Sequence, residues 1–348
     1  MLYINVQELF AVFLILCFAA PGLSSATISF NVMNYGAVGD GKTDDSAAFL
    51  KAWKAVCQTG SGIPILIIPA GKTFLLKPVT FSGPCKPSHI YVRGVTCKGP
   101  TALTFYRCNG LVVKGLRHTN SQRNHITISG CNGAKISNLH ISAPSDSPNT
   151  DGIDIASSTN IRISNSFIGT GDDCIAISSG SSNINISGID CGPGHGISIG
   201  ALGVHGEQDT VEEVHVRNCT FKATMNGVRI KTWQGGSGYA RKITFEKIKF
   251  VNTGNPIVID QYYCPSGGCQ NETTTFKISD VSYNLITGTS STEKVINFSC
   301  DKNVGCNNIV LDHVYVTASV AGKMAYAYCY NAQGRLSHTK PSVKCLLS

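Results

Sequence analysis

Short runs of alternating hydrophobic residues recur at a fixed step through the middle of the chain. The step is 22 residues, and it carries two rows of isoleucines: Ile153, Ile175 and Ile197, and then Ile155, Ile177 and Ile199. A repeat of this length with alternating β-branched residues is typical of a solenoid, in which each coil stacks its strand on the strand of the coil before. Residues one repeat apart then lie roughly 4.8 Å from each other. The pattern therefore predicts an all-β solenoid with both isoleucine rows in its interior.

An asparagine precedes several of the hydrophobic runs and extends the repeat beyond the isoleucine rows. The run at 108–113 recurs at 131–136, 159–163 and 182–186, so that the asparagines are 23, 28 and 23 residues apart: Asn109, Asn132, Asn160 and Asn183. Later coils are stretched, with hydrophobic runs at 214–216, 243–245 and 309–311. The repeat thus accounts for most of the chain, and we expect one domain over residues 27–348.

One segment near the beginning follows a helical period instead. Hydrophobic residues within 45–57 recur at three- and four-residue spacing, after Thr43 and Asp44 as possible capping residues: Ala48, Phe49, Ala52, Trp53 and Val56. A single amphipathic helix ahead of many strands is typical of an end cap that covers the open core of a solenoid. We therefore predict an N-terminal capping helix.

The first 26 residues have the features of a secretory signal peptide. Leu9–Ala20 is a hydrophobic run of 12 residues, too short to span a bilayer, and Ser24-Ser25-Ala26 provides small residues for cleavage. A membrane anchor is the alternative. Cleavage would remove Cys17 and leave 14 of the 15 cysteines, an even number that suits an oxidising compartment. Four glycosylation sequons, at Asn185, Asn218, Asn271 and Asn297, are meaningful in a secreted chain.

The composition narrows the class of partner. The net charge is +8, while only 14% of the residues are charged and 36 are glycines, as expected of a β-rich solenoid with many tight turns. A basic secreted protein favours an acidic partner such as a polyanionic polysaccharide or a membrane surface. Because the chain has neither a run of basic residues nor aromatic residues interleaved with them, we do not expect a nucleic-acid partner. Beyond the leader, no segment is long and hydrophobic enough to span a membrane.

Three ionisable residues share the 22-residue step. Asp151, Asp173 and His195 are spaced like the isoleucines, so a stack of strands would place them in one column at the bend beside the strands. Like charges at such distances oppose each other's ionisation, which costs stability but suits acid–base chemistry. The alternative is that Asp172 and Asp173 are turn residues that satisfy backbone donors, and that His195 is a turn histidine.

Four motifs around this column resemble those of the polygalacturonase family, the plant glycoside hydrolases that cleave pectin. They are Asn149-Thr150-Asp151, Gly171-Asp172-Asp173, Gly194-His195-Gly196 and Arg229-Ile230-Lys231, and the resemblance covers nearly all of the mature chain. It implies a right-handed, single-stranded parallel β-helix that hydrolyses the α-1,4-galacturonosidic bonds of pectin with inversion. It also implies a secreted, monomeric enzyme of the plant cell wall, with no metal or other cofactor.

The resemblance also gives the site residues their roles. It implies that Asp172 is the general acid, that Asp151 and Asp173 hold and activate the water, and that His195 tunes the carboxylates or contacts the substrate. An inverting enzyme needs its acid and base roughly 6.5–9.5 Å apart with water between them, and carboxylates on neighbouring coils meet that need.

Three further residues are candidates for binding the substrate. Arg229 and Lys231 are two residues apart on one strand and thus face the same way, where they could bind a galacturonate carboxylate. Tyr263 matches a tyrosine in the substrate cleft of the family. The alternatives are surface charge for the two basic residues and simple packing for Tyr263.

The cysteines suggest several disulfides. The resemblance implies a Cys174–Cys191 bond beside the catalytic turn. Close spacing makes further pairs plausible, although spacing alone leaves the connectivity open: Cys57–Cys85, Cys264–Cys269, Cys300–Cys306 and Cys329–Cys345.

The chain departs from the family between its first strands and residue 103. Family members carry several dozen more residues there, including a Gly-Thr-Ile-Asp-Gly-type turn and a Trp-Trp pair, whereas the tryptophans here are Trp53 and Trp233. A solenoid can lose coils and re-close, because each coil contacts its neighbours alone; a splice variant or a faulty gene model is the other explanation. We expect the catalytic column to survive and the stability and the amino-terminal side of the cleft to suffer. Two alternative functions remain: a wall protein that binds pectin without cutting it, and a calcium-dependent pectate lyase.

Overall fold

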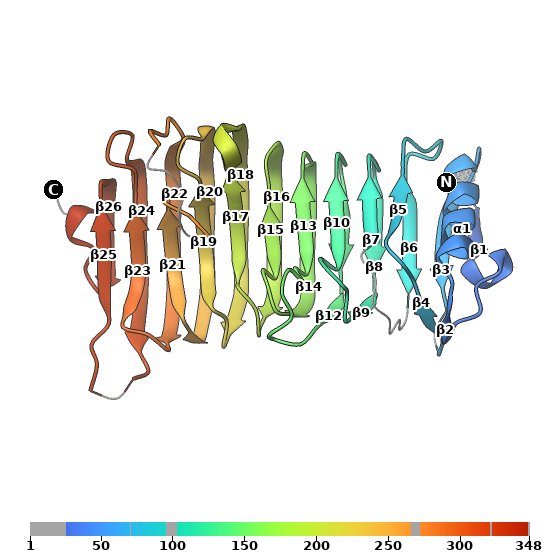
Figure 1. Ribbon diagram of the computed structural model, residues 1–348, viewed down its shortest axis with the longest axis horizontal. Helices are drawn as coiled ribbons and strands as arrows, with labels where there is room; N and C mark the ends of the chain where they lie inside the picture. The colour runs from blue at the N-terminus through green and yellow to red at the C-terminus, as the bar shows by residue number, and fades with distance from the viewer. Residues whose placement is uncertain (1–25, 70, 95–102, 266–271, 321, 347–348) are drawn as a thin grey trace, which may run out of the picture.

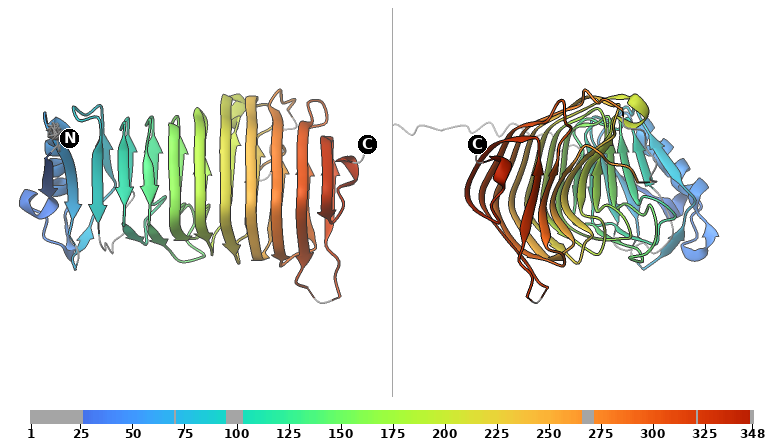
Figure 2. Two further views of the ribbon diagram at one scale, coloured as in Figure 1. Left: turned by 180° about the vertical axis from the view of Figure 1, so that it is seen from behind. Right: turned by 60° about the vertical axis from the view of Figure 1, so that its left-hand side comes forward.

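The strands wind into one elongated solenoid. The computed structural model describes residues 26–346, apart from 70, 95–102, 266–271 and 321. Successive coils lie side by side along the long axis, with the first coils and a helix at one end and the last coils at the other (Figures 1 and 2). Every pair of neighbouring strands within the described coils is parallel. The predicted all-β, right-handed parallel β-helix is confirmed.

Each coil contributes to two long sheets. The first, sheet A, has 14 strands in the described part of the chain. They are β1 (Thr27–Asn31), β3 (Ile63–Ile68), β6 (Ile90–Gly94), β8 (Leu111–Lys114), β9 (Arg117–Thr119), β11 (Lys135–Ser137), β12 (His140–Ser142), β14 (Thr159–Gly169), β16 (Ser181–Cys191), β18 (Gln208–Lys222), β20 (Ser237–Thr253), β22 (Lys277–Ser290), β24 (Cys306–Ala318) and β26 (Ala332–Lys340).

The second sheet, sheet C, has ten strands in the same described residues and carries the candidate site. They are β5 (Val79–Ser82), β7 (Leu103–Tyr106), β10 (Ile126–Ser129), β13 (Ile153–Ala156), β15 (Ile175–Ile177), β17 (Ile197–Leu202), β19 (Asn226–Thr232), β21 (Asn255–Asp260), β23 (Lys294–Ser299) and β25 (Tyr326–Tyr330). A small sheet pairs β2 (Asp40–Asp44) with β4 (Thr73–Leu75), and three short 3-10 helices lie at Val32–Tyr35, Val204–Gly206 and Lys344–Leu346.

The isoleucine rows fill the core as the repeat predicts. Ile153 pairs with Ile175 and Ile175 with Ile197, and the second row follows the same register two residues later. All six side chains are fully buried. Because side chains alternate across a strand, the residue between the two rows points out of the sheet in each coil. The core register therefore determines which side chains meet on the outer face.

The predicted capping helix is α1 (Ser46–Gln58), which packs against the first coils (Figure 1). Its buried face consists of the five hydrophobic residues named from the sequence. Trp53 stacks on Phe81 of β5 at 4.6 Å between ring centroids and donates its indole N–H to the Ser82 carbonyl. Asp44 Oδ1 accepts a hydrogen bond from the Ser46 N–H at the start of the helix. The helix thus covers the open end of the core.

The strands before and after residues 95–102, which lie outside the described residues, are paired with one another. β6 pairs with β8 from Ile90↔Leu111 to Arg93↔Lys114. In the other sheet, β5 pairs with β7 over four residues without a register shift. The described coils on the two sides of this segment are therefore neighbours in both sheets.

Four of the five suggested disulfides are present: Cys57–Cys85, Cys174–Cys191, Cys300–Cys306 and Cys329–Cys345. Cys264 is also disulfide-bonded, but Cys269 lies outside the described residues. Among the described cysteines, Cys108, Cys131 and Cys219 are free thiols buried in the core.

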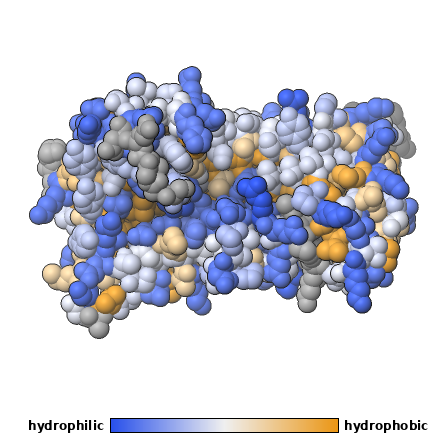
Figure 3. Space-filling view, in the orientation of Figure 1, coloured by the Kyte–Doolittle hydropathy of each residue, from blue (hydrophilic) through white to orange (hydrophobic). Residues whose placement is uncertain are grey.

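Hydrophilic residues cover much of the face in Figure 3, with smaller hydrophobic patches between them. Within the described residues, no helix is both long and apolar enough to cross a membrane. The predicted signal peptide, residues 1–26, lies almost entirely outside the part that the structure describes.

Candidate active site

The ionisable residues of the candidate site lie on the outer face of sheet C and in the turns that lead into its strands. Strand register places the outward residues of successive coils in a row, here called the central row: Asp154, Ala176, Ser198, Arg229, Val258, Asn297 and Tyr328. A second row begins two residues further along each strand and contains Lys231, Asp260, Ser299 and Tyr330. The candidate site is built where these rows meet the turns that precede β13, β15 and β17.

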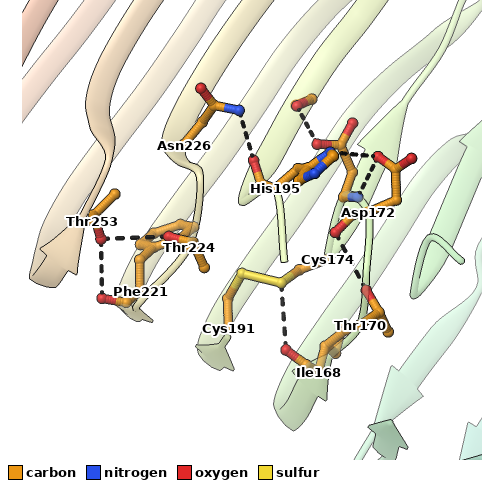
Figure 4. The surroundings of a disulfide bond; sticks show 12 residues. Ile168, Thr170, Asp172, Cys174, Cys191, His195, Phe221, Thr224, Asn226 and Thr253 are labelled. Atoms are coloured by element: carbon orange, nitrogen blue, oxygen red, sulfur yellow. Dashed lines mark hydrogen bonds and ion pairs between the residues drawn. A yellow bond between two sulfur atoms is a disulfide. The ribbon is translucent and has the colours of Figure 1, made fainter. Parts of the chain in front are cut away.

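Backbone contacts hold the turn that presents Asp172 and Asp173. The Gly171 N–H donates to Thr150 Oγ1 at 3.0 Å, and a Cβ at Gly171 would collide with the Ser147 carbonyl. The Cys174–Cys191 disulfide ties the start of β15 to the end of β16 (Figure 4). The next turn is held to this one, because the His195 N–H donates to the Asp172 carbonyl at 2.7 Å.

His195 and Asp172 form a directly hydrogen-bonded pair. His195 Nδ1 lies 2.9 Å from Asp172 Oδ1, and Figure 4 shows the imidazole pointing at this carboxylate. The same oxygen accepts the Asp173 N–H at 2.8 Å. In the described part of the chain, Asp172 Oδ2 has no hydrogen-bond partner, and the side chain is 23% exposed. Burial opposes ionisation of Asp172, but the His195 hydrogen bond and charge outweigh it and lower its pKa.

Two glycines allow this placement of the histidine. Gly194 and Gly196 have φ values of 146° and 90°, which a side chain rarely adopts. A Cβ at Gly196 would also collide with the carbonyls of Asn226 and Gly227 on the next coil. The Gly-His-Gly motif therefore reflects close approach of two coils at the site.

Asp173 is the centre of a buried ion-pair network. Its carboxylate is 1% exposed and accepts from Arg229 Nη2 at 2.9 Å and from Lys231 Nζ at 3.0 Å. Ser198 Oγ donates to Oδ1 at 2.8 Å and accepts from Arg229 Nε at 3.0 Å. The sequence places the two cations beside the carboxylates, and the structure adds that both contact Asp173. Asp173 thus lies in the turn before β15 and is buried against both cations.

Tyr263 lies over both cations. Its ring centroid is 5.8 Å from the Arg229 guanidinium carbon and 5.1 Å from Lys231 Nζ. Both distances are within the range of cation–π attraction. Tyr263 thus lies against the two cations of the candidate site.

Two more carboxyl groups complete the cluster. Burial raises the pKa of Asp151 to about 8, and the charges of Asp154, Asp172 and Asp173 add to the shift. Burial, with the Asp173 charge, raises the pKa of Asp154 to about 7, although Asp154 Oδ2 accepts from Asn124 Nδ2 at 2.7 Å. Both groups are therefore protonated at mildly acidic pH, and Asp151 keeps its proton to a higher pH than Asp154.

The cluster contains three residues that the sequence motifs did not predict: Asp154, Ser198 and Asn124. The sequence does contain a signal for Asp154 and Ser198. Asp154 lies between Ile153 and Ile155, and Ser198 between Ile197 and Ile199. Because side chains alternate along a strand, both must face outwards when the isoleucines face the core. Asn124 precedes β10 outside the 22-residue step, and no pattern singles it out.

Replacing Asp151 should make the protein more stable at neutral pH. The unfolded chain loses this proton near pH 4 while the folded protein keeps it to about pH 8, so the folded state becomes less favoured as the pH rises between these values. Asp151→Asn removes that penalty. We expect the free energy of unfolding at pH 7 to rise by at least about 1.4 kcal/mol, the equivalent of one pKa unit, with the difference vanishing near pH 4.

Denaturant unfolding at both pH values measures this effect. Asp146→Asn, at an exposed turn position, is the control and should change neither value. Equal stability of Asp151→Asn and the parent chain at pH 7 would show that Asp151 carries no ionisation penalty.

Two clusters in the described chain bring three potential metal ligands together. Asp172, Asp173 and His195 have ligand atoms within 4.8 Å of one another, as do Asp312, His313 and His338 on sheet A. In the first cluster, Arg229 and Lys231 already supply positive charge to Asp173.

The sequence was compared with known families and proteins. Residues 93–340 match the family model described as Glycosyl hydrolases family 28. A probable polygalacturonase of Arabidopsis thaliana is 44% identical over an alignment of 370 positions, gaps included. The alignment covers 91% of this chain and 80% of the relative. A polygalacturonase of Prunus persica is 38% identical over an alignment of 395 positions, gaps included, which covers 98% of this chain and all of the relative. That alignment is longer than this chain of 348 residues, so the relative carries residues that this chain lacks.

Solved structures share the fold. An exopolygalacturonase from Thermotoga maritima has a TM-score of 0.70 at 18% identity and covers 89% of this chain and 90% of its own. An endo-xylogalacturonan hydrolase from Aspergillus tubingensis has a TM-score of 0.69 at 20% identity, and the match covers 88% of this chain and 96% of that protein's chain. The family model spans most of the chain, and the relatives match it along nearly its whole length. The chain therefore belongs to family 28 of the glycosyl hydrolases and is a glycoside hydrolase.

Proposed function

We propose that this protein is a polygalacturonase that hydrolyses the α-1,4-galacturonosidic bonds of pectin. The observation that carries the proposal is the Asp172–His195 pair beside a carboxylate bound by Arg229 and Lys231. Acid–base groups and cationic donors for an anionic sugar thus lie in one cluster, although only about a tenth of each cationic side chain is exposed. The names of the plant relatives point to the same substrate.

Asp172 is proposed as the general acid. Its Oδ1 is fixed by His195 and by the Asp173 N–H, which leaves Oδ2 to carry the proton towards the glycosidic oxygen. The lowered pKa means that this acid is protonated mainly at acidic pH in the free protein. A bound polyanion and the loss of water around Asp172 both raise its affinity for a proton. Activity should therefore be greatest at acidic pH and fall as the pH rises.

Asp173 and Asp151 are proposed to hold the attacking water in different ways. Asp173 Oδ1 already accepts two hydrogen bonds, whereas Oδ2 accepts one and keeps room for a second. Protonated Asp151 can donate to the water while Asp173 accepts from it. The water oxygen then bonds to the anomeric carbon and its proton passes to Asp173. The glycosidic bond breaks, and the Asp172 proton goes to the leaving oxygen, with inversion.

Arg229, Lys231 and Tyr263 are proposed to bind the sugar next to the bond that breaks. Arg229 has five donor hydrogens and Lys231 three, and their contacts with Asp173 and Ser198 leave several free. These can form charge-assisted hydrogen bonds with a galacturonate carboxylate. Tyr263 keeps both cations in place from the other side.

A pectin hydrolase must reach the cell wall, so we also propose that residues 1–26 direct secretion and that residues 27–348 act there as a monomeric catalytic domain. The disulfides support an oxidising compartment. The basic character suits a polyanionic substrate.

Expression as a secreted protein and incubation with polygalacturonate test the proposal. New reducing ends, formed in the presence of a chelator and without an ultraviolet-absorbing product, would support hydrolysis. An absorbing, chelator-sensitive product would point to a lyase. If the folded protein binds polygalacturonate but forms no new reducing ends, the result would favour a wall protein that binds pectin without cutting it.

A further inference from the structure

Three exposed tyrosines lie at the carboxyl-terminal end of sheet C. Tyr326, Tyr328 and Tyr330 alternate along β25, the last strand of this sheet, and are 49%, 45% and 46% exposed. Ala327 and Cys329 between them face inwards against the core. All three rings therefore stand on the outer face of the sheet that carries the carboxyl groups.

Two of the rings continue the rows of the candidate active site. Tyr328 ends the central row that contains Asp154, Ser198 and Arg229, and Tyr330 ends the row that contains Lys231. Five strand steps separate β15 from β25 in the sheet order, a distance of roughly 24 Å. Figure 1 shows the two strands in one succession along the long axis. A long chain lying along this face would reach both places.

A cation accompanies the tyrosines. Lys294 of β23 pairs with Tyr326, and its Nζ lies 6.0 Å from the centroid of the Tyr328 ring. Lys294 and Tyr326 also line a cavity of about 460 Å³. Glu293, which lines the same cavity, forms an ion pair with Lys323 at 3.0 Å. Glu293 is thus paired with Lys323. Within the described residues Lys294 forms no ion pair, although its charge acts on Asp260 of β21, and its ammonium group can still attract an anion.

We propose that Tyr326, Tyr328, Tyr330 and Lys294 form a remote binding site for the galacturonate chain, which rests on the proposed function. The apolar faces of sugar rings stack on aromatic side chains, and Lys294 attracts the carboxylates. The continuity of the rows with the carboxyl cluster indicates the occupant: distal units of the polysaccharide whose near unit is cleaved. This site holds long chains and does not contact short ones.

Kinetics on substrates of two lengths test the proposal. Tyr328→Ala should raise KM for polygalacturonate about three- to tenfold, the range expected for one lost aromatic contact. KM for a short oligogalacturonate should change less than twofold, since such a chain ends before β25. Lys294→Gln should raise KM for the polymer in the same way, with the effect shrinking at high salt.

Two controls isolate the effect. Tyr315→Ala removes a tyrosine of similar exposure, 41%, from β24 in sheet A and should leave both KM values unchanged. Tyr328→Phe keeps the ring and should behave like the parent protein. Thermal melting confirms that each variant is folded, and Lys294→Gln provides the test if Tyr328→Ala does not fold.

The outcomes separate the two proposals. If the parent protein cleaves neither substrate, the proposed function fails. If it cleaves polygalacturonate and both Tyr328→Ala and Lys294→Gln retain its KM, the remote site is wrong while the hydrolase stands. An equal rise in KM for long and short chains would also overturn the remote site.

Discussion

Asp172→Asn should lower kcat on polygalacturonate by about 10²–10⁴-fold, the range that a general acid contributes. The amide has nearly the shape of the carboxyl group but no proton of suitable acidity for the leaving oxygen. Because Asp172 Oδ1 can keep its contacts with His195 and the Asp173 N–H, the turn should remain folded. Reducing-end assays across a range of pH, together with binding of polygalacturonate, measure the effect.

The distinguishing feature of this variant is the separation of binding from chemistry. Affinity for polygalacturonate should stay within a few-fold of the parent value, and the fall of activity with rising pH should disappear from whatever activity remains. Asp146→Asn is the matched control at an exposed position and should retain full activity. An Asp172→Asn protein with more than a tenth of the parent kcat would exclude Asp172 as the acid.

Asp173→Asn should be the most destabilising of the site variants. It leaves Arg229 and Lys231, which are only 11% and 10% exposed, without the charge that both contact. Breaking a buried ion pair from one side costs about 3–5 kcal/mol, because the remaining charge stays buried and unpaired. We expect a loss of this size in the free energy of unfolding, together with loss of activity because the water loses its base. Denaturant unfolding measures the first effect and the reducing-end assay the second.

Two further variants show whether the cause is the unpaired charge. Adding Lys231→Met to Asp173→Asn removes one stranded cation and should recover part of the stability without recovering activity. Glu213→Gln breaks the exposed pair with Lys242, whose side chains are 46% and 54% exposed, and should cost under about 1 kcal/mol. A loss for Asp173→Asn no larger than that for Glu213→Gln would mean that the buried network contributes nothing to stability.

The repeat predicted the architecture because the physical constraint acts on every coil. Ile153, Ile175 and Ile197 must face one interior, so a fixed step in the sequence becomes a strand register in the structure. The same reasoning placed α1, since its five hydrophobic residues could be buried on the first coils alone. Register also brought Asp173 and His195 to one place, as their shared spacing requires.

The partners within the site were harder to foresee, because they depend on side-chain reach between coils. Arg229 and Lys231 are 56 and 58 residues from Asp173, and their spacing shows that they share a face but not that both contact one carboxylate. Burial favours the protonated form of Asp151, Asp154 and Asp172 alike, but the hydrogen bond and charge of His195 reverse the shift for Asp172 alone among them, so that its pKa is lowered while the other two are raised. Identical residue types thus acquire different protonation from their surroundings.

This difference explains how one small cluster can hold both an acid and a base. The pKa values of Asp151 and Asp154 are raised, so both groups hold protons at mildly acidic pH, while the charge of Asp173 is balanced by two cations. Such an arrangement should cost stability, which the comparison of Asp151→Asn with the parent chain measures, and it suits a site that needs both proton donors and acceptors.

The stereochemistry of the first product tests the central claim most directly. Proton nuclear magnetic resonance can follow the anomeric signals while the purified protein cleaves an oligogalacturonate, before the anomers equilibrate. The account predicts that the new reducing end appears first as the β-anomer, because water held by Asp173 and Asp151 attacks from the side opposite the leaving oxygen. The α-anomer as first product would instead require a covalent intermediate on one of the carboxylates and would contradict the proposed roles.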